Sequence, residues 1–550
     1  MVLRRTVLLL LVASFLSMPP SGARAAQPNT NFIELAHVDP YAQYNDCYGY
    51  RDPNTGVEYA ILGTNTGTSV WNVGDPFNPY ETGFIPSTGA TPNHWRDFDT
   101  YGDNLYVTTE GSAGGLQVID LANPEAPVQV IKKHNFTSHT LWIDQGAGVA
   151  YCMGAGGIVG AAGFRGYSLA DPNNPTILAD WASPYYHDLW ASNGVAYGAA
   201  IFEGGHFDIL RVTNLPTVTV KAAVAYANGF THNVWPSDDG QYLYSTDELL
   251  GTGTVRVWDI SDTASVVQVA QFPVWTNTCV HNVYIKNDTA YCAWYEEGVL
   301  AFDVTDPLTP VQIGSFDTGP DTVAIGNYAG CWTVYPFLPS GVVVSSDIKQ
   351  GMHLLYYADE IGVVSGTVTD FVTGLPIAGA EVAVPDFFNR RVTTDGAGNY
   401  SAILPGGSHD VNASAAGYLS DLTGAAVTDG DTTDLDIALV PSAATGVGAG
   451  RGTESGSTPR VVLGAPSPNP TRGEATVSLD LPRAGAVSLA VFDSSGRLVR
   501  TLAAGALPAG RHAVAWDGRD DAGRAVASGA FVVRLDAGGE RRSAKLVLTR

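Results

Sequence analysis

A unit of four short apolar segments recurs along the first two thirds of this chain and constrains its fold more than any other feature. The unit is clearest over residues 279–316, and successive units begin 45 to 51 residues apart. Repeats of this length that hold four strands are typical of β-propeller blades. The seven units begin at Cys47, His94, His139, His187, His232, His281 and Trp332.

The seventh unit is incomplete, and the beginning of the chain can supply what it lacks. After Trp332 only three strands can be placed before the pattern stops near residue 358. A further strand-like segment, residues 32–38, precedes the first unit. Pairing this segment into the last blade would close the ring and leave no exposed sheet edge. We therefore predict a closed seven-bladed β-propeller over residues 31–358.

The composition fits an all-β protein and limits its partners. The chain has 62 Gly and 32 Pro among 550 residues, and only 15% of its residues are charged. This composition is rich in turn-forming residues and lacks the bias toward Ala, Glu, Lys and Leu that is typical of helical proteins. The net charge of −25 would repel phosphate backbones, so we expect no nucleic-acid partner.

The first 26 residues have the pattern of a signal peptide. Arg4 and Arg5 precede an apolar run over residues 7–18, and the small residues around Arg24 suit a cleavage site. The run is too short for a membrane anchor, and the mature chain contains no stretch that suggests a transmembrane segment. We expect a protein that is secreted or held at the outer cell surface of a bacterium.

Two smaller modules follow the propeller. Short alternating strands with Gly-rich turns predict a β-sandwich over residues 361–440. Residues 441–459 have the composition of a flexible linker, and residues 460–550 form a last unit that opens with Pro468-Asn469-Pro470. The predicted fold class is all-β, with a seven-bladed propeller followed by two small β-sandwich domains.

Several motifs of the repeat resemble a known family of propellers. They are Asp46-Cys47-Tyr48-Gly49-Tyr50, His94-Trp95-Arg96-Asp97, the segment 115–121 (GLQVIDL), Thr231-His232-Asn233, His281-Asn282-Val283-Tyr284 and Cys331-Trp332-Thr333-Val334-Tyr335-Pro336. Together they resemble the LVIVD-repeat propellers of the bacterial choice-of-anchor B group. The resemblance implies an exported surface propeller with an interchangeable C-terminal anchor, and it implies no reaction. Residues 211–216 depart from the pattern, so the resemblance does not define the edge strand of the fourth blade.

The two C-terminal modules also resemble known domains. Residues 361–440, with Thr394-Asp395-Gly396 and Ala416-Gly417-Tyr418, resemble the carboxypeptidase regulatory-like domain, which serves as a spacer or adhesion module. Residues 460–550, with Trp516-Asp517-Gly518, resemble the Ig-like domains related to the flagellar hook-cap protein and to type IX secretion sorting domains. That resemblance implies secretion or anchoring machinery as a partner, although a plain structural cap remains an alternative.

A recurrent histidine at the start of the inner strand is the strongest candidate for a functional site. We expect His94, His139, His187, His232 and His281, with Trp332, to surround one mouth of the channel and to contact a ligand there. Acidic residues follow the second strand of several blades and should lie on the same face. They are Glu110, Glu203, Asp247, Glu248, Glu296 and Glu297.

These histidines admit two interpretations. They could hydrogen-bond to the backbone of neighbouring blades and serve only the packing of the ring. Alternatively, imidazole and carboxylate groups could bind a divalent metal ion, the candidate cofactor, or act in acid–base chemistry. The proposed metal ligands are His139, His187, His232, His281, Glu110, Glu203 and Glu297. The sequence contains no recognisable catalytic motif, and catalytic residues stay unassigned.

The remaining candidates are a disulfide and an aromatic surface. Cys47 and Cys331 begin neighbouring blades, so they are the best candidates for a bridge in an oxidising compartment. Aromatic residues such as Trp190 and Trp235 could stack on carbohydrate or fill the space between blades. We expect a surface-associated binding or scaffold protein with a surface protein or carbohydrate as partner, or else a secreted metal-dependent enzyme.

Overall fold

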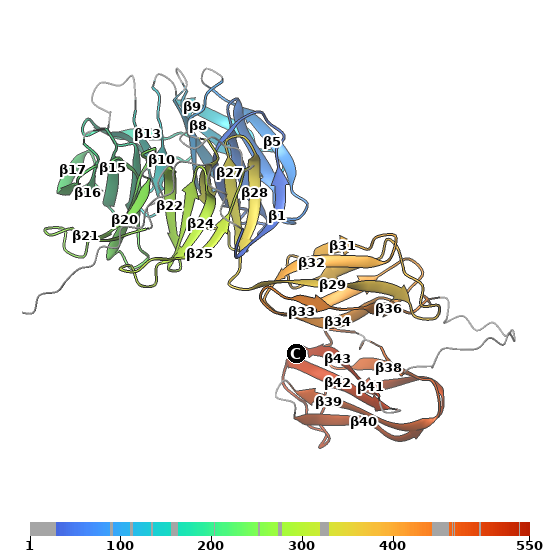
Figure 1. The fold of residues 1–550 in the computed structure, drawn as a ribbon. Helices are drawn as coiled ribbons and strands as arrows, with labels where there is room; N and C mark the ends of the chain where they lie inside the picture. The colour runs from blue at the N-terminus through green and yellow to red at the C-terminus, as the bar shows by residue number, and fades with distance from the viewer. Residues whose placement is uncertain are drawn as a thin grey trace, which may run out of the picture.

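The all-β prediction is confirmed by the computed structural model, in which strands form three successive bodies and the described ranges hold no α-helix (Figure 1). The predicted signal peptide, Glu203 and nearly all of the predicted linker lie outside these ranges. The structure describes residues 29–549, except 89–91, 111–113, 134–135, 156–162, 203, 251–252, 273–277, 320–328, 443–460, 465, 467, 494–496 and 538–539.

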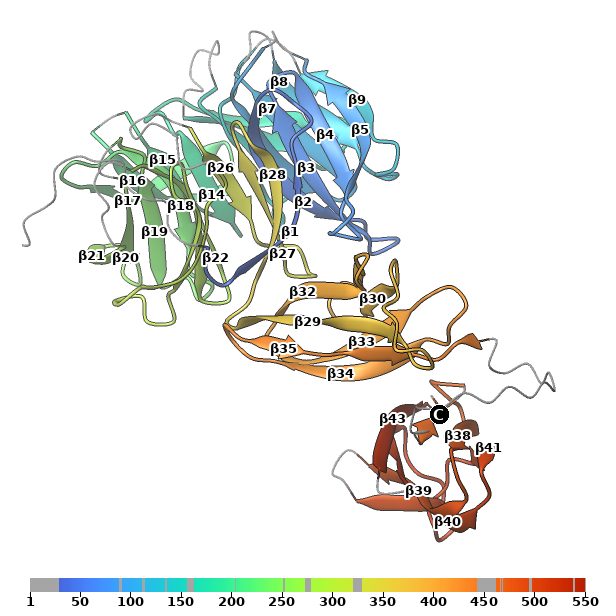
Figure 2. The ribbon, with the colours of Figure 1, turned by 45° about the vertical axis from the view of Figure 1, so that its right-hand side comes forward.

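Seven four-stranded antiparallel sheets form the N-terminal body. Neighbouring sheets stand side by side (Figure 2), and their inner strands line a central channel. In blades 1 to 6 the strands follow one another in sequence order from the channel outwards. Blades 1 to 3 are β2 (Tyr44–Arg51), β3 (Glu58–Thr64), β4 (Gly67–Asn72) and β5 (Tyr80–Pro86); β6 (Arg96–Tyr101), β7 (Asn104–Thr109), β8 (Gly115–Asp120) and β9 (Val128–Lys133); β10 (Leu141–Asp144), β11 (Val149–Met153), β12 (Phe164–Ser168) and β13 (Thr176–Trp181). Blades 4 to 6 are β14 (Asp188–Ser192), β15 (Val195–Ala200), β16 (His206–Asn214) and β17 (Thr217–Ala225); β18 (Thr231–Pro236), β19 (Tyr242–Asp247), β20 (Thr254–Asp259) and β21 (Val267–Gln271); β22 (Val280–Lys286), β23 (Thr289–Trp294), β24 (Gly298–Asp303) and β25 (Val311–Phe316).

The seventh blade joins the two ends of the propeller sequence, as the incomplete repeat predicted. Its order is β26-β27-β28-β1, so the first strand of the chain is its outermost strand. The pairing is antiparallel, with Phe32 opposite Tyr357 and His37 opposite His353. The strands are β26 (Cys331–Tyr335), β27 (Val342–Asp347), β28 (Gly351–Tyr357) and β1 (Phe32–Val38).

The repeated third strand and its exit are structural. Third-strand residues such as Val118 and Leu300 are completely buried between blades, where they add apolar area to the core. The Asp at the exit accepts a hydrogen bond from the backbone N–H two residues later, as at Asp306 and Leu308 (3.1 Å). The fourth blade departs from this pattern, because β16 and β17 each run for nine residues and pair up to Asn214 and Thr217.

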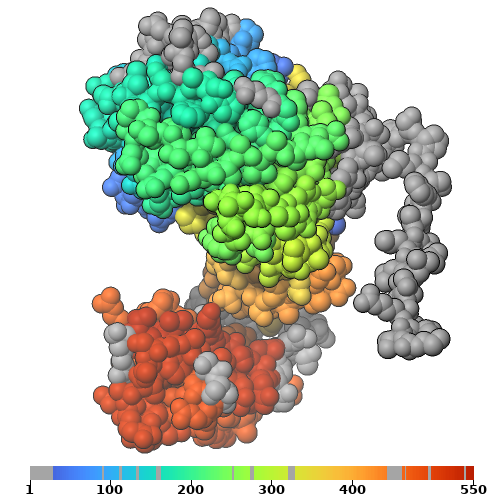
Figure 3. All heavy atoms as spheres, turned by 90° about the vertical axis from the view of Figure 1, so that its left-hand side faces the viewer, coloured from blue at the N-terminus to red at the C-terminus, as the bar shows by residue number. Residues whose placement is uncertain are grey.

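Two small sandwiches follow the propeller, and in Figure 3 the three bodies are stacked one below another. The first packs the sheet β32-β29-β35, with β36 also on β29, against β31-β30-β33-β34. The second consists of β37-β38-β41 and β40-β39-β42-β43. The strands are β29 (Ile361–Asp370), β30 (Glu381–Val384), β31 (Arg390–Thr393), β32 (Asn399–Pro405), β33 (Gly407–Ser414), β34 (Asp421–Val427), β35 (Thr432–Asp434), β36 (Ile437–Leu439), β37 (Val462–Leu463), β38 (Ala475–Leu481), β39 (Gly485–Asp493), β40 (Leu498–Leu507), β41 (Gly510–Trp516), β42 (Gly529–Ala537) and β43 (Glu540–Leu548).

The first sandwich contacts the propeller through the turn between β30 and β31. Phe387 packs against Phe77 and Tyr356, with ring centroids 6.0 and 5.3 Å away, and the Arg390 guanidinium lies 4.1 Å from the Phe77 ring. Phe77 belongs to the turn that leaves a third strand, and in a blade these turns lie at the opposite end from the start of the inner strand. This contact therefore leaves the mouth where the inner strands begin uncovered by the sandwich.

Across the described ranges, no helix is long and apolar enough to cross a membrane.

Candidate functional site

A cavity of about 290 Å³ follows the channel between the inner strands of all seven blades. Its wall includes four of the predicted histidines, several tryptophans and a group of buried carboxyl groups. Cavities of this kind, mostly apolar with a few polar groups that converge, are typical of small-molecule sites.

Seven equivalent residues, one from each blade, form a layer at one mouth of this channel. Their equivalence follows from a repeated contact: Leu141 N donates to Asp97 Oδ2 at 2.6 Å, and Val283 N donates to Asn233 Oδ1 at 3.1 Å. In both contacts the layer residue directly precedes the acceptor, and the strand registers place the corresponding residue in the other blades. The layer, which we call the mouth layer, consists of Asn45, Arg96, His139, His187, His232, His281 and Trp332.

Two of the predicted unit starts are therefore wrong by two residues. His94 precedes β6, and Arg96 takes the position in the mouth layer that we expected for His94. The His94 ring instead meets the edge of Trp332, with centroids 4.8 Å apart. Cys47 lies two residues after Asn45, which is the mouth-layer residue of the first blade. Both predicted starts matched the repeat by residue type, whereas the register of the inner strands defines the equivalent positions.

The four remaining histidines form a continuous arc. Ring centroids are 4.1 Å apart from His139 to His187 and from His187 to His232, and 4.2 Å apart from His232 to His281. The arc continues to Trp332, whose ring centroid lies 4.7 Å from that of His281. The Nδ1–H of His281 donates to the Trp332 carbonyl oxygen. Burial, followed by the neighbouring imidazoles, lowers the pKa of His187 and His232 far below its usual range, and burial lowers that of His281 to about 3. These three rings are neutral at pH 7.

Two of the expected acids approach this arc. His139 Nδ1–H donates to Glu110 Oε1 at 2.7 Å. Glu248 Oε2 lies 3.7 Å from His232 Nε2, while Glu248 Oε1 accepts from Tyr295 at 2.9 Å. Burial raises the pKa of Glu248 to about 7.

Only two members of the predicted metal-ligand set are brought together, and they are joined by Glu248, which was not in that set. In the channel, ligand atoms of His187, His232 and Glu248 lie within 4.8 Å of one another, and this is the one channel group of three that the described residues form. The other predicted ligands that the structure describes are not part of it; they are His139, His281, Glu110 and Glu297. Glu203 lies outside the described residues. Glu297 is buried at the β23–β24 turn, where its backbone N–H donates to the Trp294 carbonyl oxygen at 3.1 Å.

Arg96 is the functional candidate that the sequence analysis missed. Its side chain is 2% exposed, and Nε donates to the Thr64 carbonyl oxygen at 3.3 Å. Within the described ranges, neither Nη1 nor Nη2 has a hydrogen-bond partner. Burial alone lowers the Arg96 pKa to about 10, so the guanidinium stays charged at pH 7. A buried charge without a counter-charge is costly unless a ligand supplies one.

Buried carboxyl groups lie directly below the mouth layer. Asp46, Asp97 and Asp188 all line the cavity, and burial raises the pKa of each, to about 6 for Asp46 and well above the usual range for Asp97. Asp188 Oδ2 accepts from Asn233 Nδ2 at 2.7 Å. Neighbouring carboxyl groups raise the Asp97 pKa further, so protonated Asp97 can donate a hydrogen bond at this level.

The far part of the cavity is aromatic. Trp142 contacts Trp190 and Trp235, with ring centroids 5.8 and 5.2 Å apart, and Trp235 stacks on Phe337 at 5.3 Å. Trp294, by contrast, is completely buried between blades. Some aromatic residues therefore line the cavity, while others fill the space between blades.

The predicted bridge between Cys47 and Cys331 is not formed. All five cysteines are free and buried. The Cys47 thiol donates to the Val344 carbonyl oxygen at 3.5 Å, and Cys331 Sγ lies 3.4 Å from Ser345 Oγ. Neighbouring blades bring the two cysteines near each other, but each thiol faces its own polar partner.

Two family models match the C-terminal part of the chain. The carboxypeptidase regulatory-like domain matches residues 363–440, and the FlgD Ig-like domain matches residues 467–540. The expected resemblances to the carboxypeptidase regulatory-like domain and to the Ig-like domain of the flagellar hook-cap protein are thereby confirmed. Among curated proteins, nothing matches the chain.

Solved structures similar to this chain include several propellers. The WD40 repeats of RRP9 match with a TM-score of 0.41 and 9% identity, over 61% of this chain and 99% of that one. The C-terminal WD40 domain of Sif2 matches with a TM-score of 0.42 and 10% identity, over 60% and 99%. A putative 6-phosphogluconolactonase from Bacteroides fragilis matches with a TM-score of 0.39 and 13% identity, over 48% and 82%. The seven blades are defined by the seven four-stranded sheets of this structure and not by these similarities.

Proposed function

We propose that this protein is a surface binding protein whose propeller takes up a small anionic ligand at the channel mouth. The observation that carries the proposal is the Arg96 guanidinium, which is buried beside the cavity and has two NH₂ groups without an acceptor among the described residues. A planar guanidinium offers two parallel donors to a carboxylate or phosphate group.

The surroundings of Arg96 favour an anion that carries a polar or ring-shaped body. His187 and His232 are neutral, and in the described structure their Nδ1 atoms have no hydrogen-bond partner. They can therefore donate to or accept from hydroxyl groups. Trp95 is 44% exposed at the mouth, and Trp190 and Trp235 line the cavity, so a sugar ring could stack there. Acidic sugars are thus the first ligand class to test.

The test compares acidic sugars with matched neutral ones. Calorimetric titration of the mature protein with glucuronate and glucose, and with acetate and inorganic phosphate, should show binding of at least one anion and none of glucose. Arg96→Gln should abolish that binding. The control is Arg165→Gln, because Arg165 already pairs with Asp180 at 2.6 Å outside the channel. Equal affinity of the wild type and Arg96→Gln, or no binding of any anion, would reject the proposal.

A second candidate function is a metal-dependent enzyme at the same mouth. It rests on the His187, His232 and Glu248 group, which offers the nitrogen and oxygen ligands that zinc accepts. Metal analysis of purified protein separates the two functions. Stoichiometric metal that is lost in His232→Gln but kept in Arg96→Gln would favour the enzyme.

The C-terminal modules support a surface location. A regulatory-like sandwich would act as a spacer, and an Ig-like domain of the FlgD type suits an extracellular or surface role. We propose that residues 1–26 direct export, that the propeller belongs with the LVIVD-repeat, choice-of-anchor B type, and that the last domain engages secretion or anchoring machinery. A carbohydrate or surface protein that carries the anionic group would be the partner.

A further inference from the structure

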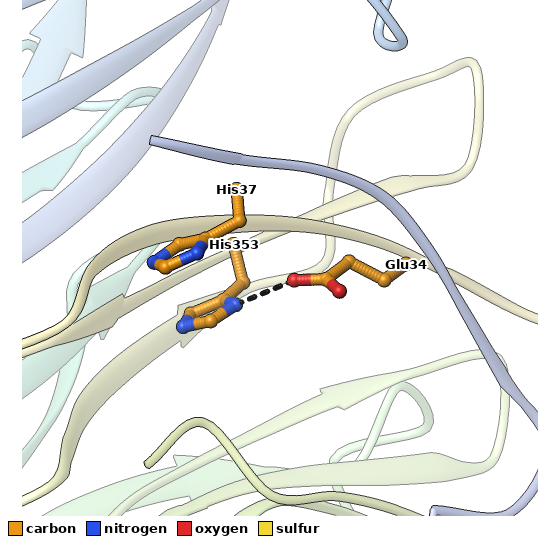
Figure 4. A group of neighbouring side chains, drawn as sticks. All are labelled: Glu34, His37 and His353. Carbon is orange, nitrogen blue, oxygen red and sulfur yellow. Dashed lines mark hydrogen bonds and ion pairs between the residues drawn. The ribbon is translucent and has the colours of Figure 1, made fainter. Parts of the chain in front are cut away.

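The closing pair of strands in the seventh blade carries a cluster outside the channel. Glu34 and His37 come from β1, and His353 comes from β28 (Figure 4). One ligand atom from each lies within 4.8 Å of the other two. The two imidazoles lie parallel, with centroids 4.2 Å apart and planes 3° apart.

A β-bulge brings Glu34 to this cluster. In a regular strand, residues three positions apart point to opposite faces of the sheet. Here the register shifts between Glu34 and Ala36, so that Glu34 lies opposite Leu355 while His37 lies opposite His353. Because residues 353 and 355 share a face, the bulge places Glu34 on the same face as both histidines. Bulges commonly redirect a side chain in this way next to functional sites.

Hydrogen bonds already orient two of the three groups. His353 Nδ1–H donates to Glu34 Oε1 at 2.9 Å, and this bond is the main cause that lowers the pKa of the Glu34 carboxyl. The other ring nitrogen, Nε2, is buried, and no described residue bonds to it. The bond to Glu34 is therefore the side-chain hydrogen bond that orients the His353 ring among the described residues. His37 is exposed, and its Nε2–H donates to the Gln350 carbonyl oxygen.

We propose that Glu34, His37 and His353 form a binding site for a divalent transition-metal ion that fastens β1 to β28. Two imidazoles and a carboxylate are ligands for Zn²⁺, Cu²⁺ or Ni²⁺, while Ca²⁺ and Mg²⁺ prefer oxygen alone. Glu34 and His37 face solvent, so water completes the coordination shell. The ion replaces the proton that joins His353 to Glu34, and the exposed His37 ring turns toward it.

The location gives this site a structural consequence. β1 is the strand that closes the ring, and two of the three ligands belong to it. An ion held by both strands binds the closed propeller and not a form in which β1 has detached. Such binding stabilises the closed form in proportion to the ion concentration.

The experiment uses the mature chain and separates this site from the channel group. Zn²⁺ binding is measured by calorimetry in the wild type, in His37→Gln, and in a His187→Gln/His232→Gln double variant. We expect the double variant to keep a Zn²⁺ site, and His37→Gln to weaken that site about tenfold or more. His512→Gln, in the last domain, is the control for a histidine outside both clusters. Loss of all Zn²⁺ binding in the double variant, or unchanged binding in a triple variant that adds His37→Gln, would overturn the proposal.

Two further measurements report on geometry and on ring closure. The electron paramagnetic resonance spectrum of Cu²⁺ bound to the double variant should show hyperfine coupling to two nitrogen nuclei. Adding His37→Gln should leave coupling to one nitrogen nucleus. In the double variant, Zn²⁺ should slow hydrogen exchange of the β1 amides, and adding His37→Gln should abolish this effect. Mg²⁺ should not slow the exchange. His37 is exposed, so its replacement should leave the fold intact. Coupling to a single nitrogen in the double variant, or equal exchange with and without Zn²⁺, would contradict the site.

Discussion

Arg96 Nε donates to the carbonyl oxygen of Thr64 at 3.3 Å, and this bond joins the inner strand of the second blade to the second strand of the first. It leaves the rest of the guanidinium without an acceptor among the described residues. A buried guanidinium without an acceptor destabilises the empty protein, and the cost of the proposed ligand site can therefore be measured.

Replacement of Arg96 by an apolar residue of similar length should stabilise the empty protein. Arg96→Met removes an unpaired buried charge and keeps most of the packing, so we expect the free energy of unfolding to rise by about 1 to 3 kcal/mol. Chemical denaturation of both proteins, without added anions, gives this value. The same variant should not bind the anion that the wild type binds. A less stable variant would mean that Arg96 has a structural partner.

The histidine arc predicts a defined response to acid. The folded pKa of His281, about 3, is below that of an unfolded histidine, near 6.5, so the unfolded chain binds more protons between these values. The stability that neutral His281 contributes is full above pH 6.5 and falls as the pH drops towards 3. We therefore expect the stability difference between the wild type and His281→Gln to shrink over this range. A constant difference from pH 7 to pH 4 would contradict a buried neutral ring.

Asp99 should respond in the opposite direction. Burial raises its pKa to about 7, and its carboxyl group accepts from Tyr48 and from the Ile143 backbone N–H, both at 2.7 Å. Because the folded pKa is above the unfolded value, the contribution of Asp99 is full at low pH and is lost as the pH rises through 7. Relative to the wild type, Asp99→Asn should be more stable at pH 8 than at pH 5. Melting temperatures across this range, measured in parallel, provide the check.

Removal of β1 should destabilise the whole propeller. Without residues 29–38, β28 loses one of its two strand partners and the core between blades 6 and 7 loses Phe32, which is 7% exposed. We expect one cooperative transition at a clearly lower temperature, because the ring is closed through this strand. A variant with Glu34→Gln and His37→Gln, which keeps the strand, is the control. An unchanged transition would contradict closure by β1.

The last domain should be separable from the propeller. Its core is distinct from that of the first sandwich, and contacts between them are polar, including an exposed ion pair of Lys545 and Asp410 at 3.6 Å. Deletion of residues 460–550 should leave the propeller transition and anion binding unchanged, since an exposed pair contributes little. In the native host the truncated protein should be released from the surface. Equal surface retention of both forms would reject an anchoring role.

Local patterns in the sequence were sufficient for the architecture. Each blade repeats the same strands and turns, so the period, the missing fourth strand after Trp332 and the extra strand at residues 32–38 predicted the ring and its closure. Four of the five histidines expected at the mouth belong to the mouth layer for the same reason. Repetition carries this information because each blade makes the same contacts with its neighbours.

The tertiary structure decided the features that depend on register and on side-chain direction. His94 stands two positions before Arg96 in the sequence. Only the pairing of β6 with β7 reveals that Arg96, and not His94, occupies the mouth layer. A bulge of one residue turns Glu34 to the face of His37 and His353, which belong to opposite ends of the propeller sequence. The Cys47 and Cys331 thiols lie on neighbouring blades but bond to different partners. Sequence determines which residues repeat, whereas contacts across strands and blades determine which side chains meet.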